Sequence, residues 1–192
     1  MEKIRSFIAI ELTAEVRESL SSLMDRLKPS KHPQVKWVTP DSVHLTLKFL
    51  GNIYPDQVAG ITQAISSAAR GMPPFELKVG GLGAFPNNQQ PRVIWVSVTG
   101  DTRKLKLLHR EIDGALSHLG FTREKRAFTP HLTLGRLKDR ASSREKADIG
   151  KLVTAIKFAG GAAMEVKEIN LMRSTLTPSG AIYSRLESIV LR

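Results

Sequence analysis

Two short stretches of the chain alternate between polar and apolar residues in the way that half-buried strands do. Residues 44–47 and 131–134 both read His-Leu-Thr-Leu. Successive side chains of a strand point to opposite faces, so His44 shares one face with Thr46, and His131 shares one with Thr133. Each stretch is therefore predicted to be a strand that buries its leucines and presents an imidazole beside a hydroxyl.

Apolar residues at helical spacing predict three helices, and other apolar runs predict the remaining strands. The helices are expected over residues 13–28, 55–71 and 101–119, with Thr13 as an N-cap and Gly71 closing the second helix. The turn-rich residues 86–91 indicate an antiparallel hairpin between the strands on either side. The predicted strands besides the two motifs are residues 6–12, 75–86, 92–98, 163–176 and 181–191.

The two identical tetrapeptides belong to a longer internal repeat. Their histidines lie 131 − 44 = 87 positions apart, and the same shift brings residues 7–10 onto 94–97 and the first helix onto the one from residue 101. Each half then has the order strand, helix, His-Leu-Thr-Leu strand, helix, strand. We predict a single bilobal domain over residues 1–192, in which each lobe presents one His/Thr face to a central cleft.

The charge balance indicates a partner that carries phosphate. Lysine and arginine exceed aspartate and glutamate by 29 − 18 = 11, and the sequence pI is near 10.2. A positive field raises the local concentration of polyanions and speeds their encounter with the protein. Composition alone does not separate RNA from DNA, or a specific ligand from a loose surface preference.

Cysteine content and the N-terminal residues bear on location. The sequence has no cysteine, which excludes disulfides and thiolate metal sites and agrees with a reducing compartment. The first twenty residues have only a short apolar stretch from Phe7, too short for a signal-peptide core or a membrane span. We therefore expect a cytoplasmic protein without membrane attachment.

Two histidines across a cleft can divide the work of acid–base catalysis. Histidine titrates near neutrality, so a neutral imidazole can take a proton from an attacking group while a protonated one gives a proton to a leaving oxygen. Threonine hydroxyls beside them can hold phosphate oxygens on which negative charge grows. The pattern is suited to metal-independent cleavage of a reactive phosphodiester such as a strained cyclic phosphate. The residues alone do not decide which histidine is the acid.

Other chemistries fit the same residues less well. Catalytic zinc needs three protein ligands, and no third His, Asp or Glu lies at ligand spacing near either motif. A serine nucleophile in a Gly-x-Ser-x-Gly turn is absent from the sequence. No metal and no other cofactor is therefore expected. Duplication alone would also copy a structural histidine, so a purely structural role for the pair stays open.

Two basic residues follow the motif histidines on the same predicted strands. Lys48 lies four residues after His44 and shares its face if the strand stays regular. Arg136 lies five residues after His131, on the opposite face unless a bulge at Gly135 shifts the parity. Solvation is the favoured interpretation for both basic side chains, with contact to substrate as the alternative.

Aromatic residues and the remaining histidines are weaker candidates. Burial in the core is favoured for the strand aromatics, although each could stack on a base; they are Trp37, Phe49, Trp95 and Phe128. The three histidines outside the motifs lack a repeated context and are expected to be solvated or at an interface; they are His32, His109 and His118.

The surrounding sequence resembles a known family in nearly its whole length. "VHLTLKFLG" and "PHLTLGRL" resemble the paired His-x-Thr-x motifs of the 2H phosphoesterase superfamily. "RSFIAIEL", "KWVTPDSVHLTLKFLGNI", "GLGAFPNNQQPRVIWVSV", "REKRAFTPHLTLGRL" and "MRSTLTPSGAIYSRL" are similar, in the same order, to blocks of its RNA 2′,3′-cyclic phosphodiesterase branch, also called 2′-5′ RNA ligase.

The resemblance implies a fold, an activity and roles for particular residues. The fold is α+β and bilobal, with two mainly antiparallel sheets facing a central cleft and helices outside. The implied activity opens a terminal 2′,3′-cyclic phosphate of RNA to a 2′-phosphomonoester, and the same groups join such an end to a 5′-hydroxyl in a 2′-5′ linkage. His44 would be the proton donor and His131 the proton acceptor, with Thr46 and Thr133 holding the phosphate. Arg126 and Tyr183 fall in family-like blocks as possible substrate contacts, together with Lys48 and Arg136.

Two other functions remain open. One keeps the chemistry but acts on a small cyclic nucleotide or another nucleotide-derived cyclic phosphate. The other is an RNA-binding module without chemistry, whose affinity depends on salt and on basic residues. Nothing in the sequence indicates an obligate protein partner, and we expect the protein to work as a monomer on an RNA with a cyclic phosphate end.

Overall fold

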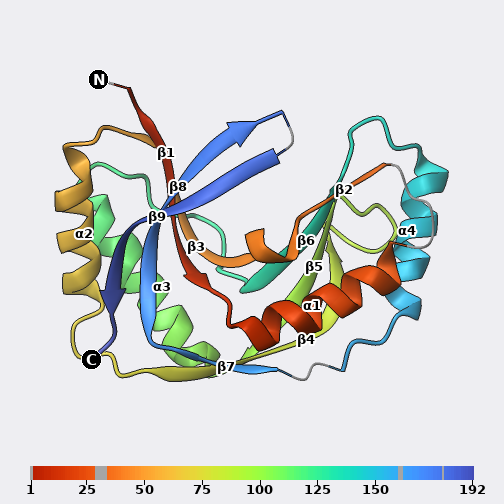
Figure 1. Ribbon diagram of the computed structural model, residues 1–192, viewed down its shortest axis with the longest axis horizontal. Coiled ribbons are helices and arrows are strands. Elements are labelled where there is room, and N and C mark those ends of the chain that lie inside the picture. The colour runs from red at the N-terminus through yellow and green to blue at the C-terminus, as the bar shows by residue number, and fades with distance from the viewer. Residues whose placement is uncertain (1, 29–33, 160–161, 179) are drawn as a thin grey trace.

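A computed structural model of the chain describes residues 2–28, 34–159, 162–178 and 180–192. His32 and most of the loop around it therefore lie outside the described residues. Figure 1 shows the elements in chain order, which are β1 (Ile4–Glu11), α1 (Ala14–Leu27), β2 (Val35–Trp37), the short 3-10 helix η1 (Pro40–Ser42), β3 (His44–Ile53), α2 (Gln57–Ala68), β4 (Phe75–Phe85), β5 (Val93–Gly100), α3 (Thr102–Ser117), β6 (His131–Leu137), α4 (Ser143–Ala155), β7 (Ala163–Val166), β8 (Glu168–Thr177) and β9 (Gly180–Val190).

The helices begin and end where local chemistry predicts. Thr13 is the N-cap of α1, and its Oγ1 accepts a hydrogen bond from the Val16 N–H at 3.4 Å. Helix α2 ends at Ala68, and Gly71 follows with a φ of +74°. Apolar spacing does not reveal α4, which a capping box of Ser142 and Glu145 starts in a charged segment. Within the described ranges, no helix has the length and apolar character needed to cross a bilayer.

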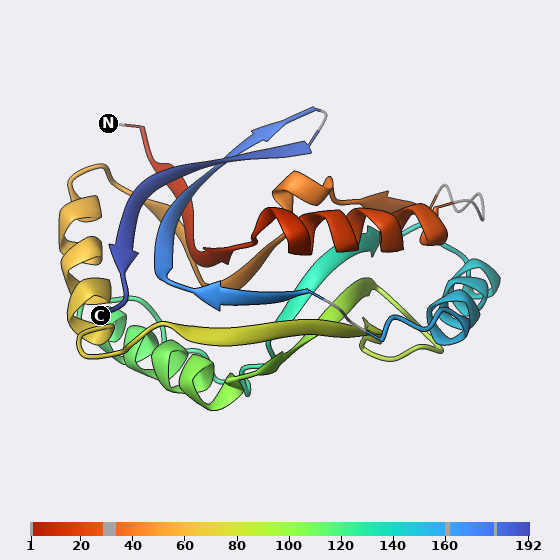
Figure 2. The same ribbon diagram turned by 60° about the horizontal axis from the view of Figure 1, so that its bottom comes forward.

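Two antiparallel sheets form the centre of the molecule and confirm the predicted α+β class. One has the strand order β3-β1-β8-β9 and the other β2-β6-β5-β4-β7. The predicted hairpin of β4 and β5 is present, with Phe85 opposite Val93. Helices α2 and α3 pack together beside the four-stranded sheet, whereas α1 and α4 lie at the five-stranded sheet (Figures 1 and 2).

The two halves of the chain exchange elements rather than folding side by side. Strands β1 and β3 come from the first half, but β1 also pairs with β8 of the second half. In the other sheet, β5 and β6 of the second half lie beside β4 of the first. Helix α1 likewise joins the side of the five-stranded sheet, where the Arg26 side chain donates to the Lys157 carbonyl oxygen at 3.4 Å. Each lobe therefore depends on both halves of the sequence.

One continuous apolar core runs through both lobes and fixes the orientation of the motif strands. Leu45 on β3 and Leu132 and Leu134 on β6 are fully buried in it. Burial of these leucines is worth about 1.5–3 kcal/mol for each side chain. Because a strand cannot turn over without exposing them, the histidine and threonine faces are held toward the opposite side.

Candidate active site

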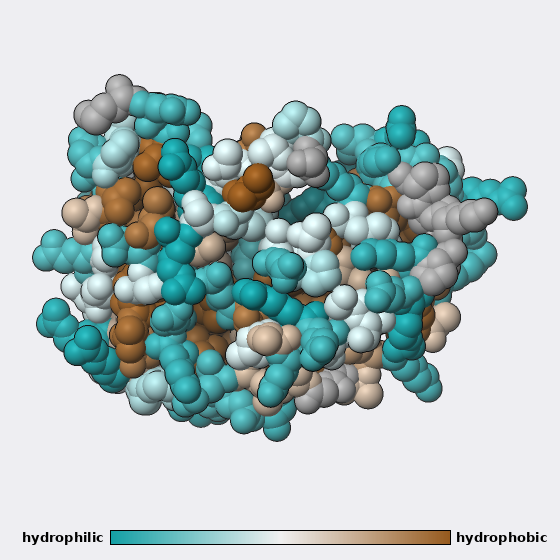
Figure 3. All heavy atoms as spheres, in the orientation of Figure 1, coloured by the Kyte–Doolittle hydropathy of each residue, from teal (hydrophilic) through white to brown (hydrophobic). Residues whose placement is uncertain are grey.

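A single cleft contains both His/Thr faces. It encloses about 1140 Å³ and is lined by His44, Thr46, His131 and Thr133. β3 supplies one pair and β6 the other, and these strands contact each other across the boundary between the sheets. A recess between the two parts of the molecule is visible in the space-filling view (Figure 3). The prediction that the two motifs face one gap agrees with this geometry.

The two imidazoles are oriented by equivalent hydrogen bonds. Nδ1 of His44 lies 2.9 Å from the Ser42 carbonyl oxygen, and Nδ1 of His131 lies 2.7 Å from the Thr129 carbonyl oxygen. Because a carbonyl oxygen can only accept, each Nδ1 must carry the hydrogen. Nε2 is then the nitrogen left to exchange a proton on each ring.

The rings around the two histidines differ. His44 stacks on Phe7, with ring centroids 4.7 Å apart, and meets the edge of Tyr183 at 5.0 Å. His131 meets Phe85 edge-on at 5.0 Å. Burial lowers the pKa of His44, while its hydrogen bond to the Ser42 carbonyl and the charge of Glu11 act in the opposite direction.

The residues opposite the histidines on the neighbouring strands also differ. Glu11 lies opposite His44 in the β1–β3 pair, whereas Ser97 lies opposite His131 in the β5–β6 pair. Glu11 is held by Arg185, whose Nε donates to its Oε2 at 3.0 Å, and by the side-chain amide of the buried Asn170 at 2.9 Å. Only the His44 side of the site thus has a carboxylate at this register position.

A bulge follows each threonine and redirects the next side chains. The β1–β3 register skips Leu47, and the β5–β6 register skips Leu134. The second bulge turns the exposed Arg136 to the cleft. This is the outcome predicted for a bulge at Gly135, although the extra residue is Leu134. The first bulge turns Phe49 to the cleft face, opposite Phe7 on β1.

The structure corrects both expectations for the Lys48 side chain. The bulge at Leu47 puts Lys48 opposite the core residue Ile8, so it does not share a face with His44. Nor is it solvated, because only 8% of the residue is exposed. Its Nζ donates to Asp113 Oδ1 on α3 at 2.5 Å and to the Thr122 carbonyl oxygen at 2.8 Å. The regular alternation assumed for the strand gives no sign of this parity change.

The strand aromatics are less buried than expected, most of all Phe49. This ring is 67% exposed in the cleft, so the prediction that it lies in the core is wrong. Trp37, Trp95 and Phe128 are half-buried. Phe49 lies near Phe7, with ring centroids 6.1 Å apart, and adds an exposed apolar ring to the cleft.

Residues 121–130 form a loop that borders the cleft just before the second motif. Arg126 is exposed on this loop and lines the cleft, and Tyr183 lines it from β9. His109 also borders the cleft, half-buried and stacked on Phe128 with ring centroids 4.1 Å apart. From the sequence alone His109 is expected to be solvated or interfacial, and only the fold brings it to the site. His118 is exposed, as expected.

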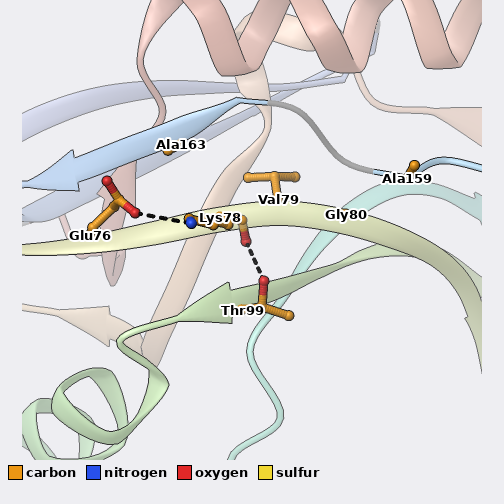
Figure 4. A pocket seen from close by; sticks show the side chains of 7 residues that line it. All are labelled: Glu76, Lys78, Val79, Gly80, Thr99, Ala159 and Ala163. Atoms are coloured by element: carbon orange, nitrogen blue, oxygen red, sulfur yellow. Dashed lines mark hydrogen bonds and ion pairs between the residues drawn. The ribbon is translucent and has the colours of Figure 1, made fainter.

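A second, smaller hollow contains none of the predicted site residues (Figure 4). It is lined by Glu76, Lys78, Val79, Gly80, Thr99, Ala159 and Ala163. Its polar groups already interact with each other, since Lys78 Nζ lies 3.6 Å from Glu76 and Thr99 Oγ1 donates to the Lys78 carbonyl oxygen at 3.4 Å. Over the described ranges, no group of three or more His, Cys, Asp or Glu residues is arranged to hold a metal ion.

The fold and the site together define a class of protein. Two His-x-Thr faces that meet in one cleft of a duplicated α+β fold are the arrangement expected of the two-histidine phosphoesterases that the sequence resembles. A family model described as LigT like Phosphoesterase matches the chain twice, over residues 10–95 and 96–183. The chain belongs to this family.

Relatives of known name are similar over almost the full chain. The RNA 2′,3′-cyclic phosphodiesterase of Methanothermobacter thermautotrophicus is 36% identical over 185 residues, which cover 96% of this chain and 97% of the relative. The protein of the same name from Thermotoga maritima is 35% identical, over 95% of this chain and 93% of the relative.

Solved structures agree with the fold. The protein TT0787 of Thermus thermophilus is 28% identical with a TM-score of 0.79, and the match covers 98% of each chain. Escherichia coli LigT complexed with 3′-AMP is 25% identical with a TM-score of 0.77, and the match covers 99% of each chain. The two matches of the family model also bear on the internal repeat. They begin 96 − 10 = 86 residues apart, close to the predicted offset of 87 residues.

Proposed function

We propose that the protein is an RNA 2′,3′-cyclic phosphodiesterase. It opens the terminal cyclic phosphate of an RNA to a 2′-phosphomonoester by acid–base catalysis with two histidines and no metal. The observation that carries this proposal is the equivalent geometry of the two motifs, in which each Nδ1 donates to a carbonyl oxygen and each Nε2 remains for proton exchange in one cleft. The names of the relatives support the same reaction.

The proposed reaction needs one proton acceptor and one proton donor. His131 takes a proton from a water molecule, whose oxygen attacks the phosphorus atom of the cyclic phosphate. The bond from phosphorus to the 3′ oxygen breaks, and His44 gives a proton to that oxygen. Thr46 and Thr133 donate hydrogen bonds to the nonbridging oxygens as charge grows on them. When a 5′-hydroxyl attacks in place of water, the same two proton transfers break the bond to the 3′ oxygen and join the two RNA ends in a 2′-5′ linkage.

The difference between Glu11 and Ser97 supports these roles. A carboxylate opposite His44 favours its protonated form, which a proton donor needs at the start of the reaction. The neutral serine opposite His131 exerts no such charge, which suits a proton acceptor. Because burial works against the charged form of His44, the phosphate anion itself would contribute to holding the donor proton in the complex.

Three exposed or half-buried side chains of the cleft are proposed to contact the RNA. Arg136 faces the phosphate site from β6 beyond Thr133, and Arg126 extends from the neighbouring loop. Tyr183 borders His44 and would contact the nucleoside. The proposal includes an RNA substrate with a cyclic phosphate end. It also includes a monomeric enzyme without an obligate protein partner and a cytoplasmic location.

The proposal is tested with a short RNA that ends in a 2′,3′-cyclic phosphate, incubated with the purified protein in the presence of EDTA. We expect a product with a 2′-phosphate, identified by its resistance to a 3′-specific phosphatase. His44→Ala and His131→Ala should each lower kcat by at least about 10²-fold while thermal unfolding stays cooperative, because neither ring is part of the core. His118→Ala, at an exposed histidine, is the matched control and should keep full activity.

Other outcomes identify the rival functions. Turnover of 2′,3′-cyclic mononucleotides without turnover of RNA would assign the protein to small cyclic nucleotides instead. Salt-sensitive binding of the RNA without turnover, unaffected by either histidine change, would indicate a binding module. Activity that EDTA abolishes would contradict the metal-independent mechanism.

A further inference from the structure

A buried ion pair joins three segments of the chain beside the cleft. Lys48 on β3 contacts Asp113 on α3, and the two residues are 8% and 9% exposed. The same lysine donates to the Thr122 carbonyl oxygen at 2.8 Å, and the Glu124 backbone N–H donates to Asp113 Oδ1 at 3.3 Å. A motif strand, a helix and the loop of residues 121–130 therefore meet at one pair of charges.

Stability alone does not account for this pair. Removing two charges from water is costly, and well-packed apolar residues in place of a buried ion pair are often neutral or stabilising. Burial opposes ionisation of Asp113, yet hydrogen bonds from Lys48 and from the Glu124 N–H hold the pKa of this carboxyl below its ordinary value. The charged pair is thus maintained by its bonds to the loop as well as by mutual attraction.

A second contact fixes the same loop to the same helix. The Phe128 ring lies parallel to that of His109, within 8°, at a centroid distance of 4.1 Å. His109 is one helical turn before Asp113 on α3. The two residues of this helix that contact the loop are therefore neighbours on its surface. The loop then reaches Thr129, whose carbonyl oxygen accepts the hydrogen bond from His131 Nδ1.

The loop also carries positive charge into the cleft. Arg123, Lys125 and Arg126 are all exposed, and all three line the cleft on the side of the second motif. An RNA strand that ends at the two histidines must pass one wall of the cleft. Exposed basic side chains fixed in place on that wall are suited to its phosphates.

We infer that Lys48 and Asp113 are positioning residues, which fix the 121–130 loop so that His131 is correctly placed and the loop's basic residues are held against the RNA strand. Lys48 lines the cleft, but its Nζ is bonded to Asp113 and to the Thr122 carbonyl oxygen, so we assign the pair a role through the loop and not on the reacting atoms. The pair bonds the strand of the first motif to the loop that precedes the second motif, and so fixes where that loop lies. The kinetic part of this inference rests on the proposed function, whereas the structural part does not.

The test replaces both charges at once, in Lys48→Met with Asp113→Leu. Removing both partners leaves no unpaired buried charge, and the groups that they contact on the loop belong to exposed residues that can bond to water. Lys167→Met with Glu165→Leu is the matched control, because it removes an exposed ion pair of 3.0 Å elsewhere in the chain. If the first double variant does not fold, Asp113→Asn, which keeps the volume and removes the charge, takes its place.

Limited trypsin digestion measures the loop without reference to activity. We expect cleavage after Arg123, Lys125 and Arg126 to become about tenfold faster in the double variant, and to stay unchanged in the control, with the sites identified by mass spectrometry. Unchanged cleavage at these bonds with an unchanged melting temperature would overturn the inference.

Kinetics separate positioning from a purely structural role. We expect kcat to fall by roughly tenfold to a hundredfold with both RNA and a cyclic mononucleotide, because His131 is displaced, and KM to rise only for RNA. Faster cleavage of the loop with unchanged kcat and KM would overturn the positioning role. If the parent protein turns over neither substrate, the proposed function fails, and the inference is judged on the trypsin result and on whether the NMR signal of the His131 Nδ1 hydrogen is lost in the variant.

Discussion

At the scale of single residues, the duplicated site is less symmetric than its motifs. His44 and His131 have the same sequence context and the same Nδ1 hydrogen bond, but Glu11 lies opposite the first and Ser97 opposite the second. Identical motifs therefore carry different electrostatic surroundings. The proposed division between donor and acceptor is supported by these neighbours on the adjacent strands, which the motifs themselves do not contain.

This difference predicts a shift in the pH profile. A proton donor must be protonated, so kcat/KM falls as the pH rises through the pKa of His44. Glu11 raises that pKa, so Glu11→Gln lowers it further and moves the alkaline limb of the profile to lower pH. The control Ser97→Ala should leave this limb in place. The measurement is kcat/KM as a function of pH for the parent and the variant. If Glu11→Gln leaves the alkaline limb where it is in the parent, the role of His44 as proton donor is contradicted.

Phe49 is predicted to stack on the base of the terminal nucleotide. Because stacking on an aromatic ring is worth about 1–3 kcal/mol for each base, Phe49→Ala should lower kcat/KM for RNA by about tenfold or more. Stability should be preserved, since the ring is 67% exposed. The comparison substrate is an RNA whose terminal nucleotide lacks its base. An equal loss with both substrates would show that the ring does not act through stacking.

At the scale of elements, regular periodicity was sufficient for α1, α2 and α3 but not for α4 or for the motif strands. The sequence predicts an apolar side of α3 made of Leu105, Leu108, Ile112, Leu116 and Leu119. Helix α3 buries the first four, whereas Leu119 lies beyond its end at Ser117 and is exposed. The bulges at Leu47 and Leu134 break the alternation of β3 and β6. They place Phe49 on the face of His44 and Arg136 on the face of His131, and they remove Lys48 from the face of His44. A bulge depends on the partner strand, so the sequence of one strand does not reveal it.

Two adjacent leucines of α3 offer a test of its predicted face. Leu108 is fully buried, whereas Leu107 is 41% exposed. Leu108→Ala should lower the free energy of unfolding by about 2–5 kcal/mol because it leaves a cavity in the core. Leu107→Ala should change it by less than about 0.5 kcal/mol. Urea unfolding of the two variants measures both values, and equal losses would contradict the assigned face.

At the scale of the whole molecule, the net charge of +11 should govern encounter with RNA more than with a mononucleotide. The logarithm of kcat/KM for RNA is expected to fall with the logarithm of the salt concentration, by about 0.7 for each phosphate contacted on a single strand. A cyclic mononucleotide should give a shallower slope. Arg126→Ala should reduce the RNA slope, whereas Arg103→Ala, at an exposed residue of α3 outside the cleft, should not. Equal slopes for both substrates would argue against strand contacts.

The sequence by itself determined the α+β class, most of the helices and strands, the duplication and the family. These features depend on local periodicity and on motifs that are repeated along the chain, such as the two His-Leu-Thr-Leu strands, and both are visible in the sequence. Burial of Leu45 and Leu132 then follows from alternation alone. The fold comparisons and the two matches of the family model agree with those predictions.

Only the tertiary structure decided which residues of the two halves meet. The exchange of β4 and β8 between the sheets, the carboxylate of Glu11 opposite His44, and the pairing of Lys48 with Asp113 all join positions far apart in the chain. The physical reason is that pairing between strands and burial of charge depend on partners in space. A single strand fixes which of its faces is apolar, but its partner fixes the register and the bulges that aim each side chain.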